Sequence, residues 1–346
     1  MADFWVHDNL YFFLRRYIDL CTRLSFRKIE TVGTIPDMEG AAWLIVYNHT
    51  CTLMDPLLVL QSRKEATSFG ARADTFRNPT VARFLHFCKM IPLARKNRER
   101  ADEVARNAEM MGKIDQVLAH GIPFCIAPEG RHRPMHSLLP IRRGIALMAF
   151  RSAAQRPTFI LPVGIEYSDW YHYRAHARMT FGEPLDVNAL AARLEGLEND
   201  ARDAALQEEL YKRLSAQIFF LPDDESYPER LAQAESARPQ PNRVKDILLA
   251  VITSPLFVLS AVLALPMWAI AEYLCQFKIK DKAFSNTVRY GVRLVGTPIF
   301  ALLLAVLLFC LLPWWAAALL WLLFFPSYSF FYDWLNWISG RTQPPL

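Results

Sequence analysis

A histidine and an aspartate stand six residues apart in the segment Asn48-His49-Thr50-Cys51-Thr52-Leu53-Met54-Asp55-Pro56, directly after a strongly apolar run. A neutral imidazole can take a proton from an alcohol, and a carboxylate on its other ring nitrogen can stabilise the imidazolium that forms. Pro56 also suits the first turn of a helix, which would make Asp55 the N-cap. Two interpretations therefore stand side by side: a His49–Asp55 acid–base pair, or a helix cap beside a hydrogen-bonded core histidine.

A basic cluster follows a second apolar run, in Pro128-Glu129-Gly130-Arg131-His132-Arg133 and then in Arg142-Arg143-Gly144. The arginines offer paired donors to a phosphate, Gly130 allows a close backbone approach, and a helix after Gly144 would present its positive end. If the two apolar runs are parallel strands, this cluster and His49 lie at the same edge of the sheet. A base beside phosphate donors is what acylation of a phosphorylated alcohol requires, and a solvated basic loop is the other interpretation.

The sequence does not favour a metal site or a disulfide framework. The six cysteines include no Cys-x-x-Cys pair. His132 with His136, and His172 with His176, are four residues apart, but neither pair has a cysteine at ligand spacing. We therefore expect reduced thiols, no metal and no cofactor.

The elements that must position these residues alternate between strand and helix. The expected strands are short apolar runs, at 43–47, 123–127 and 158–165, with an edge strand at 178–181. The expected helices have helical spacing of apolar residues, at 56–61, 81–90, 100–120, 144–154, 189–197 and 201–219. This order predicts an α/β domain with a mixed, largely parallel sheet flanked by helices.

The chain is 53% hydrophobic, and the excess is concentrated near its C-terminus. Ile247–Ala271 and Pro298–Phe325 contain no acidic or basic residue, and each exceeds the ~20 residues that cross a hydrocarbon core about 30 Å thick. Between them lie five cations, which disfavour placing that segment outside the cell: Lys278, Lys280, Lys282, Arg289 and Arg293. Prolines interrupt both stretches, so we expect re-entrant or bent segments rather than one full crossing each.

The motifs follow the order found in the glycerolipid acyltransferases, and the sequence resembles that family, which includes glycerol-3-phosphate acyltransferases, lysophosphatidate acyltransferases and tafazzin. The matching segments are Asn48–Asp55, Pro92–Arg95, Pro128–Gly130 with Arg142–Gly144, Leu161–Gly164, and Phe181–Leu185. Together they extend over roughly residues 25 to 190.

Two positions depart from the usual pattern of the family. The common His-x4-Asp spacing would place the acid at Met54, whereas this chain has His-x5-Asp. That spacing and the hydrophobic C-terminal region resemble a narrower subgroup, the fungal-type glycerol-3-phosphate and dihydroxyacetone-phosphate acyltransferases and related bacterial proteins. Arg131-His132 stands where Thr-Arg is common, which leaves open whether Arg131 or Arg133 meets a phosphate.

The resemblance implies that His49 is the general base and that Asp55 orients it, with acyl-CoA or acyl-carrier protein as the donor. It implies no covalent acyl-enzyme, so Cys51 is not expected to be a nucleophile. Substrate-binding roles are implied for Arg95, Glu129, Gly130, Arg131, Arg133, Arg142 and Arg143.

The sequence then divides into four parts: an amphipathic membrane-associating helix at 1–30, an acyltransferase domain at 31–221, a linker at 222–246 and a hydrophobic membrane region at 247–340. The apolar side of the first part suits packing on its own domain equally well. The basic residues beside apolar segments favour membrane lipids as partners, and we do not expect nucleic acid. Because the implied donors are cytosolic, the active site is expected at the cytoplasmic face of a membrane.

The expected function is a membrane-bound O-acyltransferase that acylates glycerol-3-phosphate or a related phosphorylated glycerol in phospholipid synthesis. A lysophospholipid or lyso-amino-acid lipid acyltransferase, or a transacylase, would use the same residues. A non-catalytic lipid-binding scaffold is the alternative from another class. Met54 at the usual acid position favours the scaffold, whereas Asp55-Pro56 and Pro128-Glu129-Gly130 oppose it.

Overall fold

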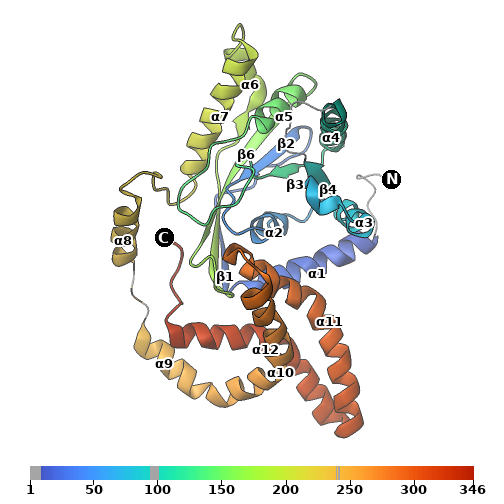
Figure 1. Cartoon of the computed structure of the whole chain (residues 1–346), viewed down its shortest axis with the longest axis vertical. Coiled ribbons are helices and arrows are strands. Elements are labelled where there is room, and N and C mark those ends of the chain that lie inside the picture. Colours follow the sequence, from blue (N-terminus) through green and yellow to red (C-terminus); the bar gives the residue numbers. More distant parts are fainter. Residues whose placement is uncertain (1–8, 94–100, 239, 241) are drawn as a thin grey trace.

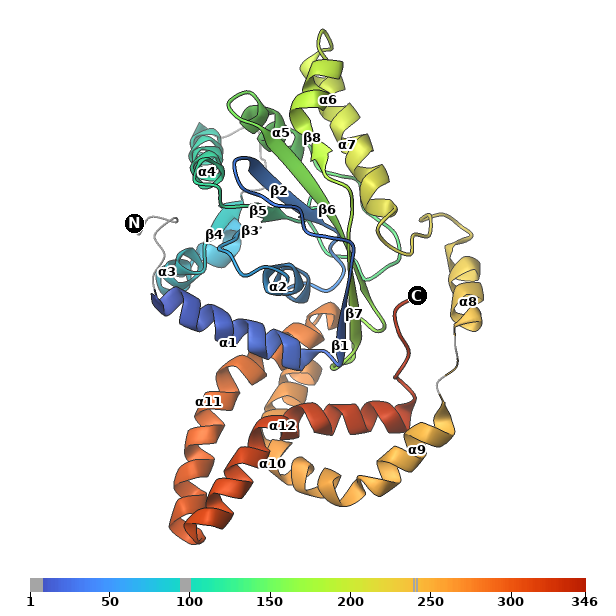
Figure 2. The same ribbon diagram turned by 180° about the vertical axis from the view of Figure 1, so that it is seen from behind.

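The chain folds into a sheet domain joined to a group of C-terminal helices (Figures 1 and 2). The computed structural model describes residues 9–93, 101–238, 240 and 242–346, so Arg95 lies outside the described residues. One eight-stranded sheet forms the centre of the domain, and helices cover both of its faces.

Five neighbouring strands of the sheet are parallel, in the order β6-β2-β5-β3-β4. Their bounds are Ala42–Tyr47 for β2, Ser68–Arg72 for β3, Met90–Leu93 for β4, Phe124–Ile126 for β5 and Thr158–Tyr167 for β6. The remaining strands are β1 (Lys28–Val32), β7 (His176–Phe181) and β8 (Leu185–Asp186). Strands β7 and β8 run antiparallel to β6, and β1 pairs in parallel with β7. The mixed, largely parallel sheet predicted from the sequence is confirmed.

Two hydrophobic cores hold the sheet between layers of helices. One core packs against α4 (Ala101–Ala119), α5 (Gly144–Ala153), α6 (Val187–Arg193) and α7 (Asn199–Ser215). The other lies beneath α1 (Asn9–Ser25) and α2 (Met54–Gln61), and α3 (Pro79–Phe87) precedes β4. All six residues of β2 are buried, so packing on both faces fixes the position at which this strand ends.

The predicted central strands and their flanking helices are confirmed, with ends shifted by a few residues. Three expectations were wrong. Strand β7 is not an edge, because β1 pairs outside it. Met90 begins β4 rather than ending the helix expected at 81–90, because α3 ends at Phe87. Helix α2 begins at Met54 with Leu53 as its N-cap, so Asp55 lies inside the first turn and is not the cap.

Five helices follow the sheet domain: α8 (Tyr227–Ala237), α9 (Arg243–Ile252), α10 (Ser254–Tyr273), α11 (Ser285–Leu311) and α12 (Trp314–Ser339). Helix α8 lies within the segment expected to be a linker. Three segments are long and apolar enough to cross a membrane: Ser254–Lys278, Lys282–Leu311 and Trp314–Ser339. The second apolar stretch is divided just before Pro313, and its two halves lie side by side in α11 and α12 (Figure 1).

Polar contacts fasten the C-terminal helices to the sheet domain. Arg174, in the loop before β7, donates from Nε and Nη2 to the two carboxylate oxygens of Asp333 on α12, at 2.9 and 2.6 Å. Asn336 Nδ2 donates to the Tyr173 carbonyl at 3.0 Å, and Arg293 Nε of α11 donates to the Tyr173 hydroxyl at 2.9 Å. The two ends of the α11–α12 hairpin therefore lie against the same side of the sheet domain.

Helix α1 lies between the sheet domain and these helices. It contacts α2 and α11, and the Tyr17 hydroxyl donates to the Leu294 carbonyl at 2.8 Å. Its outer face exposes Leu10, Phe13 and Leu20. One side of the amphipathic helix is thus packed on the protein, and apolar side chains remain on the other.

Candidate active site

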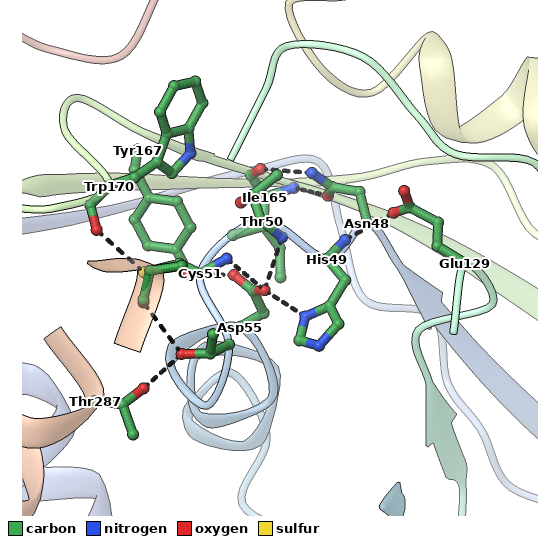
Figure 3. A network of polar contacts seen from close by, with 12 residues as sticks. Asn48, His49, Thr50, Cys51, Asp55, Glu129, Ile165, Tyr167, Trp170 and Thr287 are labelled. Carbon is green, nitrogen blue, oxygen red and sulfur yellow. Dashed lines mark hydrogen bonds and ion pairs between the residues drawn. The ribbon is translucent and has the colours of Figure 1, made fainter. Parts of the chain in front are cut away.

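His49 and Asp55 form a direct pair at the carboxyl end of β2 (Figure 3). The distance from His49 Nδ1 to Asp55 Oδ2 is 2.7 Å. Because Asp55 Oδ2 also accepts two backbone N–H groups, the Nδ1 position of His49 is assigned as the donor, which leaves Nε2 as the basic nitrogen. Nε2 points away from Asp55, and the His49 side chain is 22% exposed. The pair therefore has a buried anchor and an accessible base.

Asp55 organises the whole loop between β2 and α2. Its Oδ2 atom accepts hydrogen bonds from the backbone N–H groups of Thr50 and Cys51, both at 2.9 Å. Its Oδ1 atom accepts one from the Tyr167 hydroxyl at 2.6 Å. Burial, with the Asp55 charge beside it, holds the pKa of Tyr167 well above its usual value, so the phenol stays protonated and remains a donor. The carboxylate that orients His49 is itself held by three further donors.

Glu129 joins the basic cluster to the histidine segment. It follows β5, which pairs in parallel with β2, so the two strand ends meet as predicted. Glu129 Oε1 accepts from the His49 backbone N–H at 2.8 Å, and Oε2 accepts from the Leu139 backbone N–H at 2.7 Å. The residue is 2% exposed, and burial raises the pKa of its carboxyl despite these two hydrogen bonds. Both oxygens therefore bind the protein's own backbone, a geometry that fits a brace between the two segments better than a substrate ligand.

The arginines of the cluster separate into two groups. Arg133 pairs with Asp223 and also donates to Ser137, while Arg143 pairs with Asp203. Arg131 and Arg142 have exposed side chains on either side of Gly130, whose φ is +74°. A side chain at position 130 would lie 3.5 Å from Arg142 and would be strained at this backbone angle, so glycine keeps the space open. Of the four arginines in this cluster, Arg131 and Arg142 are the better placed to meet an anion.

Several residues around His49 were missed by the sequence analysis. Tyr167 ends β6, and Asn48 directly follows the adjacent strand β2. The Asn48 side chain bonds both the N–H and the C=O of Ile165, at 2.7 and 2.9 Å. The position of Asn48 beside the histidine at a strand end was the one signal for its role. Tyr167 gave none, because its partner Asp55 is 112 residues away.

The connection between α10 and α11 also reaches the site. Asp281 Oδ2 lies 2.9 Å from Nε2 of His132, and this hydrogen bond lowers the pKa of Asp281. The His132 ring packs edge-on against both His49 and Phe284, with centroid distances of 5.7 and 5.2 Å. The apolar region of the chain thus supplies part of the wall beside the candidate base. In the described residues no group of three or more potential ligands could hold a metal ion.

Part of the chain matches a known protein family. Residues 25–166 match the family model described as Acyltransferase. This matched part of the chain contains both His49 and Asp55 as well as Glu129.

Two homologous relatives come from Saccharomyces cerevisiae. Glycerol-3-phosphate O-acyltransferase 2 is 29% identical over 37% of this chain and 17% of its own length. Glycerol-3-phosphate O-acyltransferase 1 is 31% identical over 27% of this chain and 12% of its own length. The matches thus span less than a fifth of either relative. Among solved structures, the crystal structure of the 1-acyl-sn-glycerophosphate acyltransferase PlsC from Thermotoga maritima matches with a TM-score of 0.43 and 17% identity, over 62% of this chain and 84% of that one.

Proposed function

We propose that this protein is a membrane-bound O-acyltransferase that transfers a fatty acyl group from an acyl thioester to a hydroxyl of glycerol-3-phosphate or a related phosphorylated glycerol. The observation that carries the proposal is the 2.7 Å His49–Asp55 pair at the end of β2, inside the acyltransferase domain. The similarity to two glycerol-3-phosphate O-acyltransferases supports this choice of acceptor.

In the proposed mechanism, Nε2 of His49 takes the proton of the acceptor hydroxyl as its oxygen attacks the thioester carbonyl. The tetrahedral intermediate then collapses, the carbon–sulfur bond breaks and the new ester bond remains. The protonated His49 returns its proton to the departing sulfur, which leaves as the free thiol. Asp55 holds Nδ1 throughout and stabilises the imidazolium.

A direct transfer suits the environment of the nearby thiol. Cys51 is buried, and its burial together with the Asp55 carboxylate holds the pKa of the thiol well above its usual value. A thiol in that state is a poor nucleophile. The proposed mechanism therefore uses no acyl-cysteine.

For the phosphate groups we propose Arg131 and Arg142 as the principal ligands, with Gly130 leaving room between them. Arg95 remains a proposed ligand and lies outside the described residues. Arg133 and Arg143 already form ion pairs with carboxylates. We therefore propose that they attract the phosphate through their charge without binding it directly. We assign Glu129 to holding His49 in place.

The proposed organisation keeps the four parts expected from the sequence and places the active site at the cytoplasmic face of a membrane. Acyl-CoA and acyl-carrier protein are cytosolic donors, and basic residues lie in the connection before α11, beside the site. The segments at 1–30 and 247–340 would contact lipid, while residues 222–246 join the domain to the apolar region.

The test is acyl transfer from labelled acyl-CoA and from acyl-carrier protein by the purified full chain. The acceptors should be glycerol-3-phosphate, dihydroxyacetone phosphate, lysophosphatidate and a lyso-amino-acid lipid. We expect product from glycerol-3-phosphate and a loss of at least ~1000-fold in His49→Ala. His120→Ala is the control, because that exposed residue lies directly after α4 and its ring bonds the Gln116 carbonyl.

A preference for a lysolipid acceptor would replace the proposed substrate but keep the chemistry. Equal rates for wild type and His49→Ala would remove the catalytic role of His49. Binding of lipid without transfer to any acceptor would leave the scaffold function instead.

A further inference from the structure

Thr52, between His49 and Asp55, adopts a backbone conformation that its side chain disfavours. Its φ is +46°, in the left-handed region, and a β-branched residue is a rare occupant of that region. The residue is also 5% exposed, so neighbouring groups rather than solvent determine its conformation. Such a conformation persists only where surrounding contacts over-determine it.

The contacts that hold Thr52 come from the C-terminal apolar region. Its hydroxyl lies 2.6 Å from the hydroxyl of Thr287, in the first turn of α11, and 3.4 Å from the Ala283 carbonyl. The two threonines are 235 residues apart in the sequence. In Figure 3, Thr287 lies on the ribbon of the C-terminal helices, facing the loop that bears Cys51 and Asp55.

A second contact fixes the same two segments to each other. The Trp170 carbonyl accepts from Asn286 Nδ2 at 2.8 Å and from Cys51 Sγ at 3.6 Å. The start of α11 is therefore held at two adjacent residues, with Asn286 bonded to the sheet domain and Thr287 bonded to the loop. Because the start of α11 is fixed in this way, Thr287 can hold Thr52 in its disfavoured conformation.

The loop held in this way sets the geometry of the base. The N–H groups of Thr50 and Cys51 both bind Asp55 Oδ2, the same oxygen that binds His49. If Thr52 relaxed toward negative φ, these N–H groups would turn and the carboxylate would lose its orientation. A displacement of about 1 Å in such a constellation is enough to reduce turnover strongly.

We propose that Thr287 is a positioning residue for the His49–Asp55 pair, so that the C-terminal apolar region completes an active site whose acid and base both lie in the sheet domain. This inference rests on the proposed acyltransferase function. It adds that the helices do more than attach the enzyme to lipid. A chain that lacks them, or in which α11 has separated from the loop, would keep both catalytic side chains but lose their alignment.

The first experiment compares Thr287→Val, Thr287→Ser and Thr297→Val in the full chain in detergent micelles. Valine keeps the shape of threonine but removes the hydroxyl, and we expect kcat to fall by ~10-fold with KM for both substrates within about twofold. Serine restores the hydroxyl, so its kcat should approach that of wild type. Thr297, on the same helix, is the matched control, and its valine variant should behave as wild type.

The second experiment is a double-mutant cycle with Thr52→Gly. Glycine adopts φ of +46° without strain and has no hydroxyl for Thr287 to bind. In the Thr52→Gly background, Thr287→Val should therefore cause no further fall in kcat. The melting temperature of every variant is measured alongside, to separate misalignment from unfolding.

A third measurement does not depend on the acyl acceptor. The low-field proton resonance of a His Nδ1–H bonded to a carboxylate, assigned here by its loss in His49→Gln, should be present in wild type, Thr287→Ser and Thr297→Val and lost in Thr287→Val. Retention of this resonance in Thr287→Val, or an undiminished Thr287→Val effect in the Thr52→Gly background, would overturn the inference. Absence of acyl transfer from the wild type, with the resonance still lost in Thr287→Val, would refute the proposed function and leave the positioning role standing.

Discussion

At the scale of single residues, the site depends on buried carboxylates whose oxygens are all in use. Asp55 accepts from His49, Thr50, Cys51 and Tyr167, and Glu129 accepts from the backbone of His49 and Leu139. A buried carboxylate is stable only when such donors surround it. Positioning of His49 is therefore shared between two acids, one on its ring and one on its backbone.

Substitution of Glu129 separates the two roles considered for it. If Glu129 braces the two segments, Glu129→Gln should lower both stability and kcat with little change in KM. The reason is that one backbone N–H then faces the amide NH2 group. The expected loss of stability is about 2 kcal/mol, the cost of an unsatisfied hydrogen bond to a charged group. Melting temperature and steady-state kinetics check this. A raised KM for the phosphorylated acceptor with unchanged stability would identify Glu129 as a substrate ligand.

His136 predicts a pH dependence of stability. Its ring packs against Trp170 and Phe219, and burial, with Arg238 nearby, lowers the pKa of the imidazole from 6.5 to about 4. The unfolded chain therefore binds a proton more readily between these values. The contribution of neutral His136 to the free energy of unfolding should be fully present above pH 6.5. It should be lost as the pH is lowered toward 4, by up to about 3 kcal/mol. Between pH 7.5 and 5, the melting temperature of His136→Phe should fall less than that of wild type. An equal fall in the two proteins would contradict this assignment.

At the scale of elements, the parallel pairing of β2 with β5 brings the two motifs together, and α11 closes the site from outside the sheet. Figure 2 shows α1 across the junction between the sheet domain and the C-terminal helices. The chemical groups follow the strand ends, and the helices that contact these segments hold the groups in place.

The ion pair that attaches α12 to the sheet domain predicts a large loss of stability when Arg174 is substituted. Arg174 binds Asp333 with two hydrogen bonds, and the two side chains are only 12% and 15% exposed. Arg174→Ala leaves a largely buried carboxylate without its partner, which costs about 3 kcal/mol. The apparent melting temperature in detergent should fall by several degrees. Arg72→Ala is the matched control, because both members of its pair with Asp74 are exposed, at 62% and 40%, and the pair should contribute below about 1 kcal/mol.

At the scale of the whole molecule, contacts bring the start of α9, the segment after α10 and the end of α12 to one side. Arg243, at the start of α9, donates to the carbonyls at the end of α12, while the segment after α10 meets His132. Three complete crossings would leave one of these ends on the far side of the bilayer. The contacts therefore favour segments that enter the membrane and return.

The length of the hairpin agrees with this topology. The part of α11 that exposes apolar side chains, from Val295 to Leu311, rises about 25 Å at ~1.5 Å per residue, somewhat less than a hydrocarbon core of about 30 Å. Its tip exposes Trp314 and Trp315. We infer that the tip remains within the bilayer.

Cysteine labelling in oriented vesicles tests the topology. In a Cys310→Ser background, Lys280→Cys should react with a membrane-impermeant thiol reagent from the cytoplasmic side only, and Trp315→Cys should be protected from both sides. The Cys310→Ser protein without an added cysteine measures labelling of the remaining native thiols. Reaction of position 280 from the outside would refute the re-entrant arrangement.

The sequence by itself determined the α/β class, the central strands, the motifs at two strand ends and the concentration of apolar residues near the C-terminus. These features are local: apolar periodicity marks strands and helices, and a strand end places its next residues at the edge of a sheet. The same local evidence placed Asp55 as a possible cap, because a proline after an acid suits both roles.

Only the tertiary structure decided which groups hold the pair in place. Tyr167, Asp281 and Thr287 lie 112 or more residues from the partners they bind, and no spacing pattern links positions so far apart. Both carboxylate oxygens of Glu129 accept hydrogen bonds from backbone N–H groups, and the residue type alone did not predict these partners. Long-range packing determined these contacts, because burial forces each polar group to find whichever donor or acceptor the fold brings near it.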